Sequence, residues 1–249
     1  MSLFGNLTTD AEAESQEKDV VSSGNSFGPV DSNIYDFVID MAYVDKSKGG
    51  ATSVNFTFKN QEGNVVKVQE WVSSGDAKGN RNFYLDKNGK KNYLPGFKTV
   101  NDITLLAIGK ELSTVPTEPK MVKLYDFDQR KEVPQQKEVI VDLLGEEITL
   151  GLFKQIEDIN TKNSEGVYVP SGHTIEKNVI NKVFRTKDSM TTVEIKAQAT
   201  EAQFINSWKE KYVGIVVDKS AAKAGHKPKP KANAPVETAK EETSDSLFG

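Results

Sequence analysis

The pattern that decides the fold class runs from residue 54 to residue 73 and reads VNFTFKNQEGNVVKVQEWVS. Phe56 and Phe58 alternate with polar residues, with the period of two that is typical of a half-buried strand. A turn at 61–64 then leads into a second alternating run at 65–73, so the stretch predicts a β-hairpin. We therefore expect a protein that is built mainly of strands.

Outward from this hairpin, most of the remaining sequence also predicts strands. Asn88-Gly89, a strong hairpin signal, lies between strand-like runs at 81–86 and 91–94. Further strands are expected at 35–43, 120–132, 147–159, 168–169, 179–185 and 191–196, although 176–184 is also compatible with a helix. Helices are expected at 100–108 and at 201–212, the second with Phe204, Ile205 and Trp208 facing inward. Many short strands with one or two short helices favour an OB-fold-like, partly open Greek-key barrel.

The run at 35–43 illustrates the expected division into two faces. Apolar residues occur at every second position there, so they are predicted to share one face of a strand. These residues are Tyr35, Phe37, Ile39, Met41 and Tyr43.

The composition of the 249 residues excludes several classes of protein. No Cys is present, which excludes a disulfide framework, a thiol nucleophile and a Cys-based zinc site, and two His are too few for a His-rich metal cluster. No apolar run approaches the roughly 18 residues that span a bilayer, and no basic-then-apolar leader opens the chain. We expect a soluble protein of a reducing compartment.

The net charge of −4 conceals charged segments of both signs. Residues 67–98 carry seven Lys or Arg against three acids, whereas 138–165 carry seven acids against two Lys. A ligand responds to the local field rather than to the total charge, so the weakly acidic total does not exclude nucleic acid as a partner.

Both ends of the chain are predicted to be flexible. Residues 1–30 form an acidic arm with few apolar residues, and 219–249 turn from a Lys/Pro stretch to an acidic tail. The interpretation leaves 31–218 as the folded core. The tetrapeptide Ser-Leu-Phe-Gly occurs at both ends, at 2–5 and 246–249.

No arrangement of residues typical of catalysis is found, so we expect neither an enzyme nor a cofactor. Gly109-Lys110 lacks the other residues of a phosphate loop, and the run at 86–89 lacks the acidic ligand of a calcium loop. Adjacent carboxylates such as Glu146-Glu147 would point to opposite faces of a strand.

The segment 67–98 interleaves cations with aromatic residues, which is the pattern of a single-strand binding surface. Trp71 is expected on the polar face of its strand beside Lys67, where a base could stack on it, or where it could cover a neighbouring loop. Phe83 and Phe97 fit core packing better, and the lysines at 87–91 could belong to a solvated hairpin tip. The candidate DNA-binding residues are Lys67, Trp71, Lys78, Arg81, Tyr84, Lys90, Lys91 and Tyr93.

The acidic tail suggests a second function. Such a tail can occupy a basic groove, recruit partners when DNA displaces it, or only increase solubility. If it masks the groove, deletion of 237–249 tightens DNA binding. The candidate partner-binding residues of the tail are Glu241, Glu242, Asp245, Leu247 and Phe248.

Several motifs together resemble the single-stranded DNA-binding proteins of tailed bacteriophages. The resemblance covers roughly residues 1–187. Its motifs are MSLFGNL at 1–7, NYLPGF at 92–97, LLAIGKEL at 105–112, VKLYDF at 122–127, KEVP at 131–134, DLLG at 142–145 and NVINKVF at 178–184.

This resemblance implies an OB-fold that coats exposed strands during phage replication, recombination and repair, in the cytoplasm of an infected bacterial host. It transfers no individual DNA-contacting residue. The expected partners are single-stranded DNA and, through the tail, phage or host replication proteins. Two alternatives remain open: a phage structural or adaptor protein whose β-rich body associates with itself, and a binder of duplex as well as single-stranded DNA.

Overall fold

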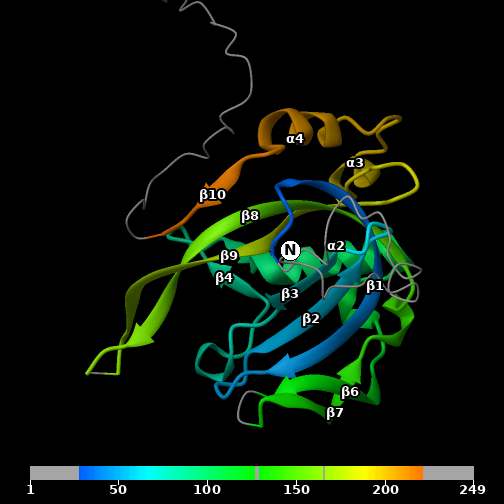
Figure 1. Ribbon diagram of the computed structural model, residues 1–249. Coiled ribbons are helices and arrows are strands. Elements are labelled where there is room, and N and C mark those ends of the chain that lie inside the picture. The colour runs from blue at the N-terminus through cyan, green and yellow to red at the C-terminus, as the bar shows by residue number, and fades with distance from the viewer. Residues whose placement is uncertain (1–27, 127–128, 165, 221–249) are drawn as a thin grey trace, which may run out of the picture.

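The computed structural model describes residues 28–126, 129–164 and 166–220, so the expectations for the outer parts of both termini lie outside the described residues. The described part is mainly β with a largely antiparallel sheet, as predicted (Figure 1). The strands are β1 (Asn33–Lys46), β2 (Thr52–Lys59), β3 (Val65–Trp71), β4 (Phe83–Leu85), β5 (Lys91–Tyr93), β6 (Glu118–Asp126), β7 (Lys131–Val139), β8 (Glu147–Lys162), β9 (Tyr168–Phe184) and β10 (Val216–Asp218). The α-helices are α2 (Pro95–Ile108), α3 (Thr192–Lys196) and α4 (Phe204–Tyr212), three in the described part rather than one or two.

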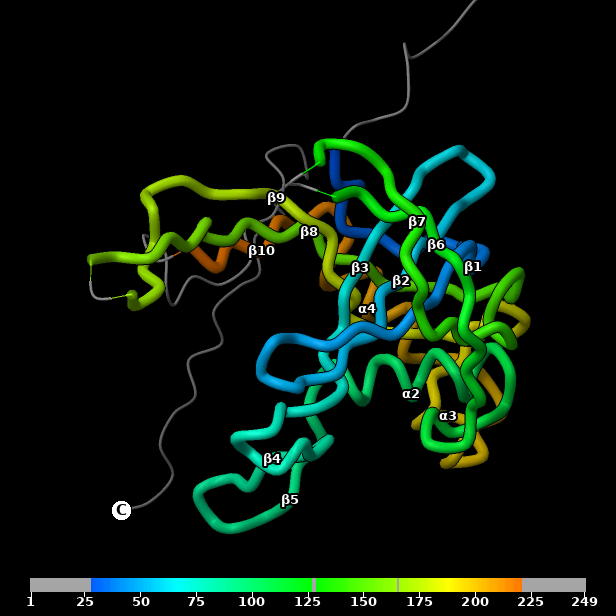
Figure 2. The backbone as a smooth tube through the Cα atoms, turned by 90° about the horizontal axis from the view of Figure 1, so that it is seen from below, coloured from blue at the N-terminus to red at the C-terminus, as the bar shows by residue number. Residues whose placement is uncertain are grey.

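The main sheet has the strand order β10-β8-β1-β2-β3, and β9 pairs with the other edge of β8. Only β10 pairs in parallel, alongside β8 beyond the segment that β1 occupies. No ladder joins β3 to β9 among the described residues, so the sheet is not closed into a barrel. The β4–β5 ribbon forms a separate small sheet that projects from the body (Figure 2).

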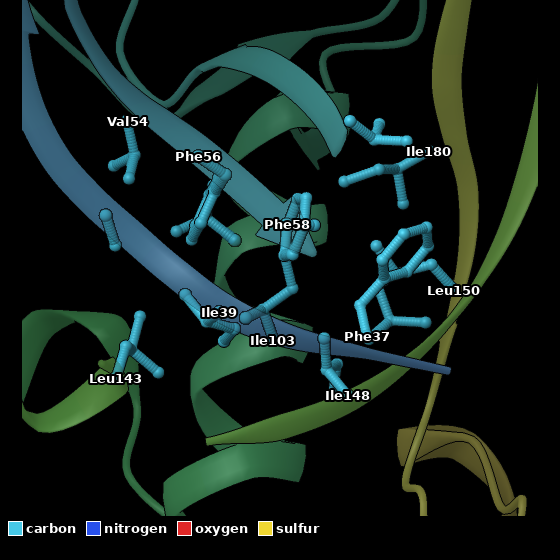
Figure 3. Packing of buried hydrophobic residues seen from close by; sticks show 14 of the residues in the cluster. Phe37, Ile39, Val54, Phe56, Phe58, Ile103, Leu143, Ile148, Leu150 and Ile180 are labelled. Carbon is cyan, nitrogen blue, oxygen red and sulfur yellow. The ribbon is translucent and has the colours of Figure 1, made fainter. Parts of the chain in front are cut away.

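The main core lies between the concave side of the sheet and helix α2 (Figure 3). The alternation that predicted the first hairpin places Phe56 and Phe58 in this core, where their rings stack with centroids 5.2 Å apart. Ile103 of α2 and Leu150 of β8 are fully buried against them. Each such side chain contributes about 1.5–3 kcal/mol by its burial.

A second, smaller core lies under α4. Trp208 is 1% exposed, and its ring lies parallel to that of Phe153 at 5.8 Å. The Trp208 ring lies directly against Gly151 of β8. A Cβ at position 151 would come within 3.0 Å of the ring, so the close packing requires the absence of a side chain on Gly151. The inward positions of Ile205 and Trp208 are as predicted, whereas Phe204 is 43% exposed, with its ring centroid 6.3 Å from that of the buried Phe184.

Strand β1 departs from the predicted alternation at a β-bulge. The register with β2 shifts between Ile39 and Met41, so Asp40 is the extra residue. Before the bulge the odd-numbered side chains face the core, and after it the even-numbered ones do. The prediction that Met41 and Tyr43 share a face with Phe37 is therefore wrong, since the bulge turns both to the outer face.

Two further segments differ from the expectation. The stretch predicted as one strand at 120–132 spans β6 and the start of β7, which form a hairpin. The predicted strand at 191–196 is helix α3, because Thr191 and Glu194 form a reciprocal capping box that favours a helix start. Among the described residues, no helix has the length and hydropathy to cross a membrane.

Candidate nucleic-acid interface

A groove of about 720 Å³ lies between the outer face of β1–β3 and the β6–β7 hairpin. The hairpin is held in place by β7, which pairs with β1 at Tyr43 and Val44 after β1 has left β8. The polar positions of three strands therefore form one wall, and the hairpin forms the other. We call this feature the outer groove; its lining includes Met41, Tyr43, Asn55, Thr57, Lys59, Lys67, Gln69, Val122, Lys123, Tyr125, Gln135 and Lys137.

The floor of the outer groove contains an unsatisfied hydrogen-bond donor. Tyr43, Asn55 and Gln69 are successive cross-strand partners, so their side chains form a row across β1, β2 and β3. The Nδ2 atom of Asn55 is buried and donates no hydrogen bond to any of the residues that the structure describes. A buried donor without a partner is uncommon in proteins, and this one belongs to a residue that lines the outer groove.

The charge of the outer groove is positive. Lys59 lies 2.9 Å from Asp40, and Lys137 lies 3.1 Å from Asp45. Lys67 and Lys123 also line the groove, and neither forms an ion pair within the described part of the chain. Two ammonium groups thus remain available for phosphate.

Trp71 extends the same face beyond Gln69. It is 41% exposed, and its cross-strand partner is Ser53, whose side chain accepts a hydrogen bond from Gln69 Nε2 at 3.2 Å. The prediction that Trp71 and Lys67 share the polar face of their strand is confirmed. This arrangement leaves much of the indole uncovered, as a stacking platform requires.

The β4–β5 ribbon carries the predicted aromatic residues on both of its faces. Phe83 and Tyr93 are cross-strand partners, and Lys91 Nζ and Arg81 Cζ lie 5.0 and 5.8 Å from the centroid of the Phe83 ring. Tyr84 pairs with Asn92 and so points to the opposite face. Tyr84 and Tyr93 are therefore both exposed, but they cannot contact the same base.

The remaining predicted lysines lie in turns next to this ribbon. Lys78 is the last residue of a 3₁₀ turn between β3 and β4. Lys90 ends the turn of the β4–β5 hairpin, and its backbone N–H donates to the Asp86 carboxylate at 3.0 Å. The structure thus divides the eight candidates into Lys67, which lines the outer groove, Trp71, which lies beyond the groove on the same face of β3, and six residues on or beside the ribbon. The tail candidates at 241–248 lie outside the described residues.

Sequence reasoning missed the other half of the outer groove. The alternation places Tyr43 on the same face as Phe37, because the bulge at Asp40 carries no sequence signal that the alternation rule detects. Asn55 lies on the polar side of a correctly predicted strand, and that polarity was the available signal. Lys123 and Lys137 lie on a hairpin that was not recognised.

One acidic side chain near the site has an unusual environment. Glu70 lies between Gln69 and Trp71 but on the opposite, inward face of β3, at the edge that faces the open side of the sheet. Burial raises the pKa of Glu70 to about 7, and the charge of Lys177 on β9 opposes this rise. The Lys177 ammonium also forms an ion pair with Glu157 at 2.6 Å, so its charge is divided between the Glu157 and Glu70 carboxylates.

The arrangement offers cations, aromatic faces and an amide donor. In the part of the chain that the structure describes, no three His, Asp or Glu side chains are grouped to hold a metal ion. Comparison of the chain with family models and with curated protein sequences gives no match.

Proposed function

We propose that this protein binds single-stranded DNA without sequence preference and without catalysis, and that the strand lies in the outer groove. The observation that carries the proposal is a combination of groups at one surface: Lys67 and Lys123, which form no ion pair among the described residues, the Asn55 amide without a partner there, and the exposed Trp71 on the same face of β3 as Lys67. Lysines contact phosphates, while aromatic faces stack on any base, so this set of groups suits sequence-tolerant binding.

The strand order supports an OB-fold-like assignment as part of this proposal. Without the β4–β5 and β6–β7 insertions, the chain runs through three consecutive antiparallel strands, a helix and two more strands. β8 pairs with β1 and with β9, and the open side lies between β3 and β9. A partly open five-stranded barrel that binds oligonucleotides across its second and third strands has this organisation.

The biological setting of the proposal rests on the resemblance to phage single-strand binding proteins. In that setting the protein coats strands during replication, recombination and repair in an infected bacterium. The acidic tail would then mask the groove or recruit replication proteins.

A fluorescence titration tests the proposal directly. The chain contains two Trp, of which Trp71 is exposed on the face of β3 that borders the groove and Trp208 is buried under α4. We expect oligo(dT) to quench the emission of Trp71, with an affinity that falls as salt rises, and the Trp71→Phe variant to lose this quenching. Absence of binding at low salt, measured by anisotropy of a labelled oligonucleotide, would refute the proposal. Duplex of the same length, added as competitor, separates single-strand preference from general DNA binding.

One observation favours a second candidate, a self-associating structural or adaptor protein. Beyond β10, strands β8 and β9 continue as a long hairpin away from the body (Figure 1). Its exposed apolar side chains are Ile159, Val167, Tyr168 and Ile175. This candidate predicts stable assemblies in the absence of DNA, measured by light scattering, and no salt-sensitive oligonucleotide binding.

A further inference from the structure

A second pocket lies where α2 meets strands β8 and β9. It has a volume of about 320 Å³ and shares no lining residue with the outer groove. We call it the α2 pocket. Three lysines from separate elements line it: Lys98 of α2, Lys182 of β9 and Lys219, which follows β10.

The α2 pocket is electropositive. Asp102 is the one acid in its lining, and that carboxylate accepts a hydrogen bond from Thr192 Oγ1 at 2.8 Å. None of the three lysines forms an ion pair within the described residues. Burial lowers the pKa of the Lys182 ammonium, the charge of Asp102 opposes this shift, and Lys98 adds to it. Lys98 and Lys182 are therefore close enough to repel each other, which an anion between them would relieve.

A buried, unpartnered acceptor forms a second, independent feature of this pocket. Gln155 is 2% exposed and lines the pocket, and its Nε2 donates a hydrogen bond to the Glu157 carboxylate. Its Oε1 is buried but accepts no hydrogen bond from the described part of the chain. Nearly all buried acceptors in proteins are satisfied, so this oxygen points to a donor that the ligand supplies.

We propose that the α2 pocket binds a nucleotide, with its phosphate at Lys98, Lys182 and Lys219 and an N–H or O–H donor at Gln155 Oε1. A nucleotide carries both groups, whereas inorganic phosphate offers no separate donor. Apolar residues, among them Phe153, Val179 and Val183, also contribute to the lining. The volume falls in the range of about 300–1,000 Å³ of small-molecule sites. This site is separate from the outer groove, and the proposal does not depend on DNA binding there.

The two Trp residues report on the two sites separately. Trp208 Nε1 donates to Asn181 Oδ1 at 2.7 Å, and the Trp208 ring packs on Phe153; both partners line the α2 pocket. In the Trp71→Phe variant, Trp208 is the single remaining Trp, and its emission follows the α2 pocket alone.

The experiment titrates Trp71→Phe protein with dAMP at low salt, with calorimetry on the unaltered chain as a second measurement. We expect saturable binding with a change in Trp208 emission. The double substitution Lys98→Gln, Lys219→Gln should weaken binding by about tenfold or more, because two charge-assisted contacts are lost. The matched control, Lys209→Gln with Lys211→Gln on α4, removes two cations outside the pocket and should leave the affinity unchanged.

Substitution of Gln155 tests the donor end of the ligand. Gln155→Leu should weaken dAMP binding while leaving the weaker binding of inorganic phosphate unchanged.

A competition experiment identifies the source of the nucleotide. Competition by a 5′-phosphorylated oligonucleotide but not by its 5′-hydroxyl counterpart would assign the bound group to a strand end. Competition by dAMP alone would assign it to a free nucleotide. The proposal is overturned if calorimetry finds no saturable dAMP binding, or if the Lys98/Lys219 variant binds as tightly as its control. If the unaltered chain binds dAMP but does not bind oligo(dT), the proposed function is refuted and the inference about the α2 pocket still holds.

Discussion

Gly96, in the first turn of α2, lies directly against the backbone of Trp71: a Cβ on Gly96 would come within 2.4 Å of the Trp71 carbonyl oxygen and 2.8 Å of its nitrogen. The start of the helix is thus packed on the last residue of β3. Helix α2 therefore holds the backbone of Trp71 in place while the indole is exposed. The same helix buries Ile103 and Leu106 in the main core.

This contact predicts that Gly96→Ala destabilises the protein. The methyl group would overlap backbone atoms that cannot move without displacing β3 or α2, so we expect a loss of about 1–3 kcal/mol in the free energy of unfolding. Chemical denaturation measures it. Gly49→Ala is the matched control, because its Cβ would approach only Ser47 Oγ, at 3.9 Å. Equal stability of the two variants would show that the close approach is relieved at no cost.

Removal of the indole should weaken single-strand binding. Trp71→Ala is expected to reduce the binding free energy for oligo(dT) by about 1–3 kcal/mol, the usual contribution of one stacked base. Anisotropy of a labelled oligonucleotide gives the affinity. Tyr168→Ala serves as control, since Tyr168 is 67% exposed on the β8–β9 hairpin and away from the groove. If both variants bind equally well, Trp71 is not the stacking residue.

The lysines of the outer groove should determine the salt dependence. In Lys67→Gln, Lys123→Gln protein we expect the slope of log affinity against log salt to fall by roughly 1.4, because each phosphate contact on a single strand contributes about 0.7. The same titration of Lys209→Gln, Lys211→Gln protein provides the comparison. An unchanged slope would place the phosphates elsewhere, with the ribbon lysines as the next candidates.

Glu70 should make stability depend on pH. Its pKa is about 7 in the folded chain against 4.5 for the ordinary side chain, so the folded state holds the proton more tightly than the unfolded state. This contribution to stability is fully present below about pH 4.5 and is lost as the pH rises through 7. Glu70→Gln should therefore be more stable than the unaltered chain at pH 8, by roughly 1–3 kcal/mol, and the difference should vanish near pH 4.

Thermal unfolding across this range of pH measures the effect. The exposed Glu132→Gln variant controls for the loss of one negative charge. A constant difference between Glu70→Gln and the unaltered chain at all pH values would show that Glu70 ionises in the same way in both states.

Local alternation was sufficient to predict much of the fold. The β2–β3 and β4–β5 hairpins, α2 and most of α4 follow from periodicity and turn residues, which act over a few neighbouring positions. The bulge at Asp40 was beyond this reasoning, since it is determined by the partner strands rather than by β1 itself. The same holds for α3, where the capping pair at Thr191 outweighs the β-branched composition.

The candidate site was predicted in part for the same reason. Trp71 and Lys67 follow from the face on which they lie in a single strand. The groove itself needs the β6–β7 hairpin to pack beside β1, and a contact between residues about 95 positions apart, such as Tyr43 and Val139, leaves no periodic trace in the sequence.

The attachment of that hairpin has a consequence for how a strand enters. β6 and β7 are joined to each other by nine residue pairs, but β7 is joined to β1 at only two, Tyr43 with Val139 and Val44 with Glu138. Beside these two pairs, the Ile140 N–H donates to the Ala42 carbonyl oxygen at 2.9 Å, and Lys137 lies 3.1 Å from Asp45. Val139 is 1% exposed, and the adjacent Ile140 belongs to the main core. The base of the hairpin is therefore anchored in the core, so a strand enters a groove whose width at Tyr43 is already set.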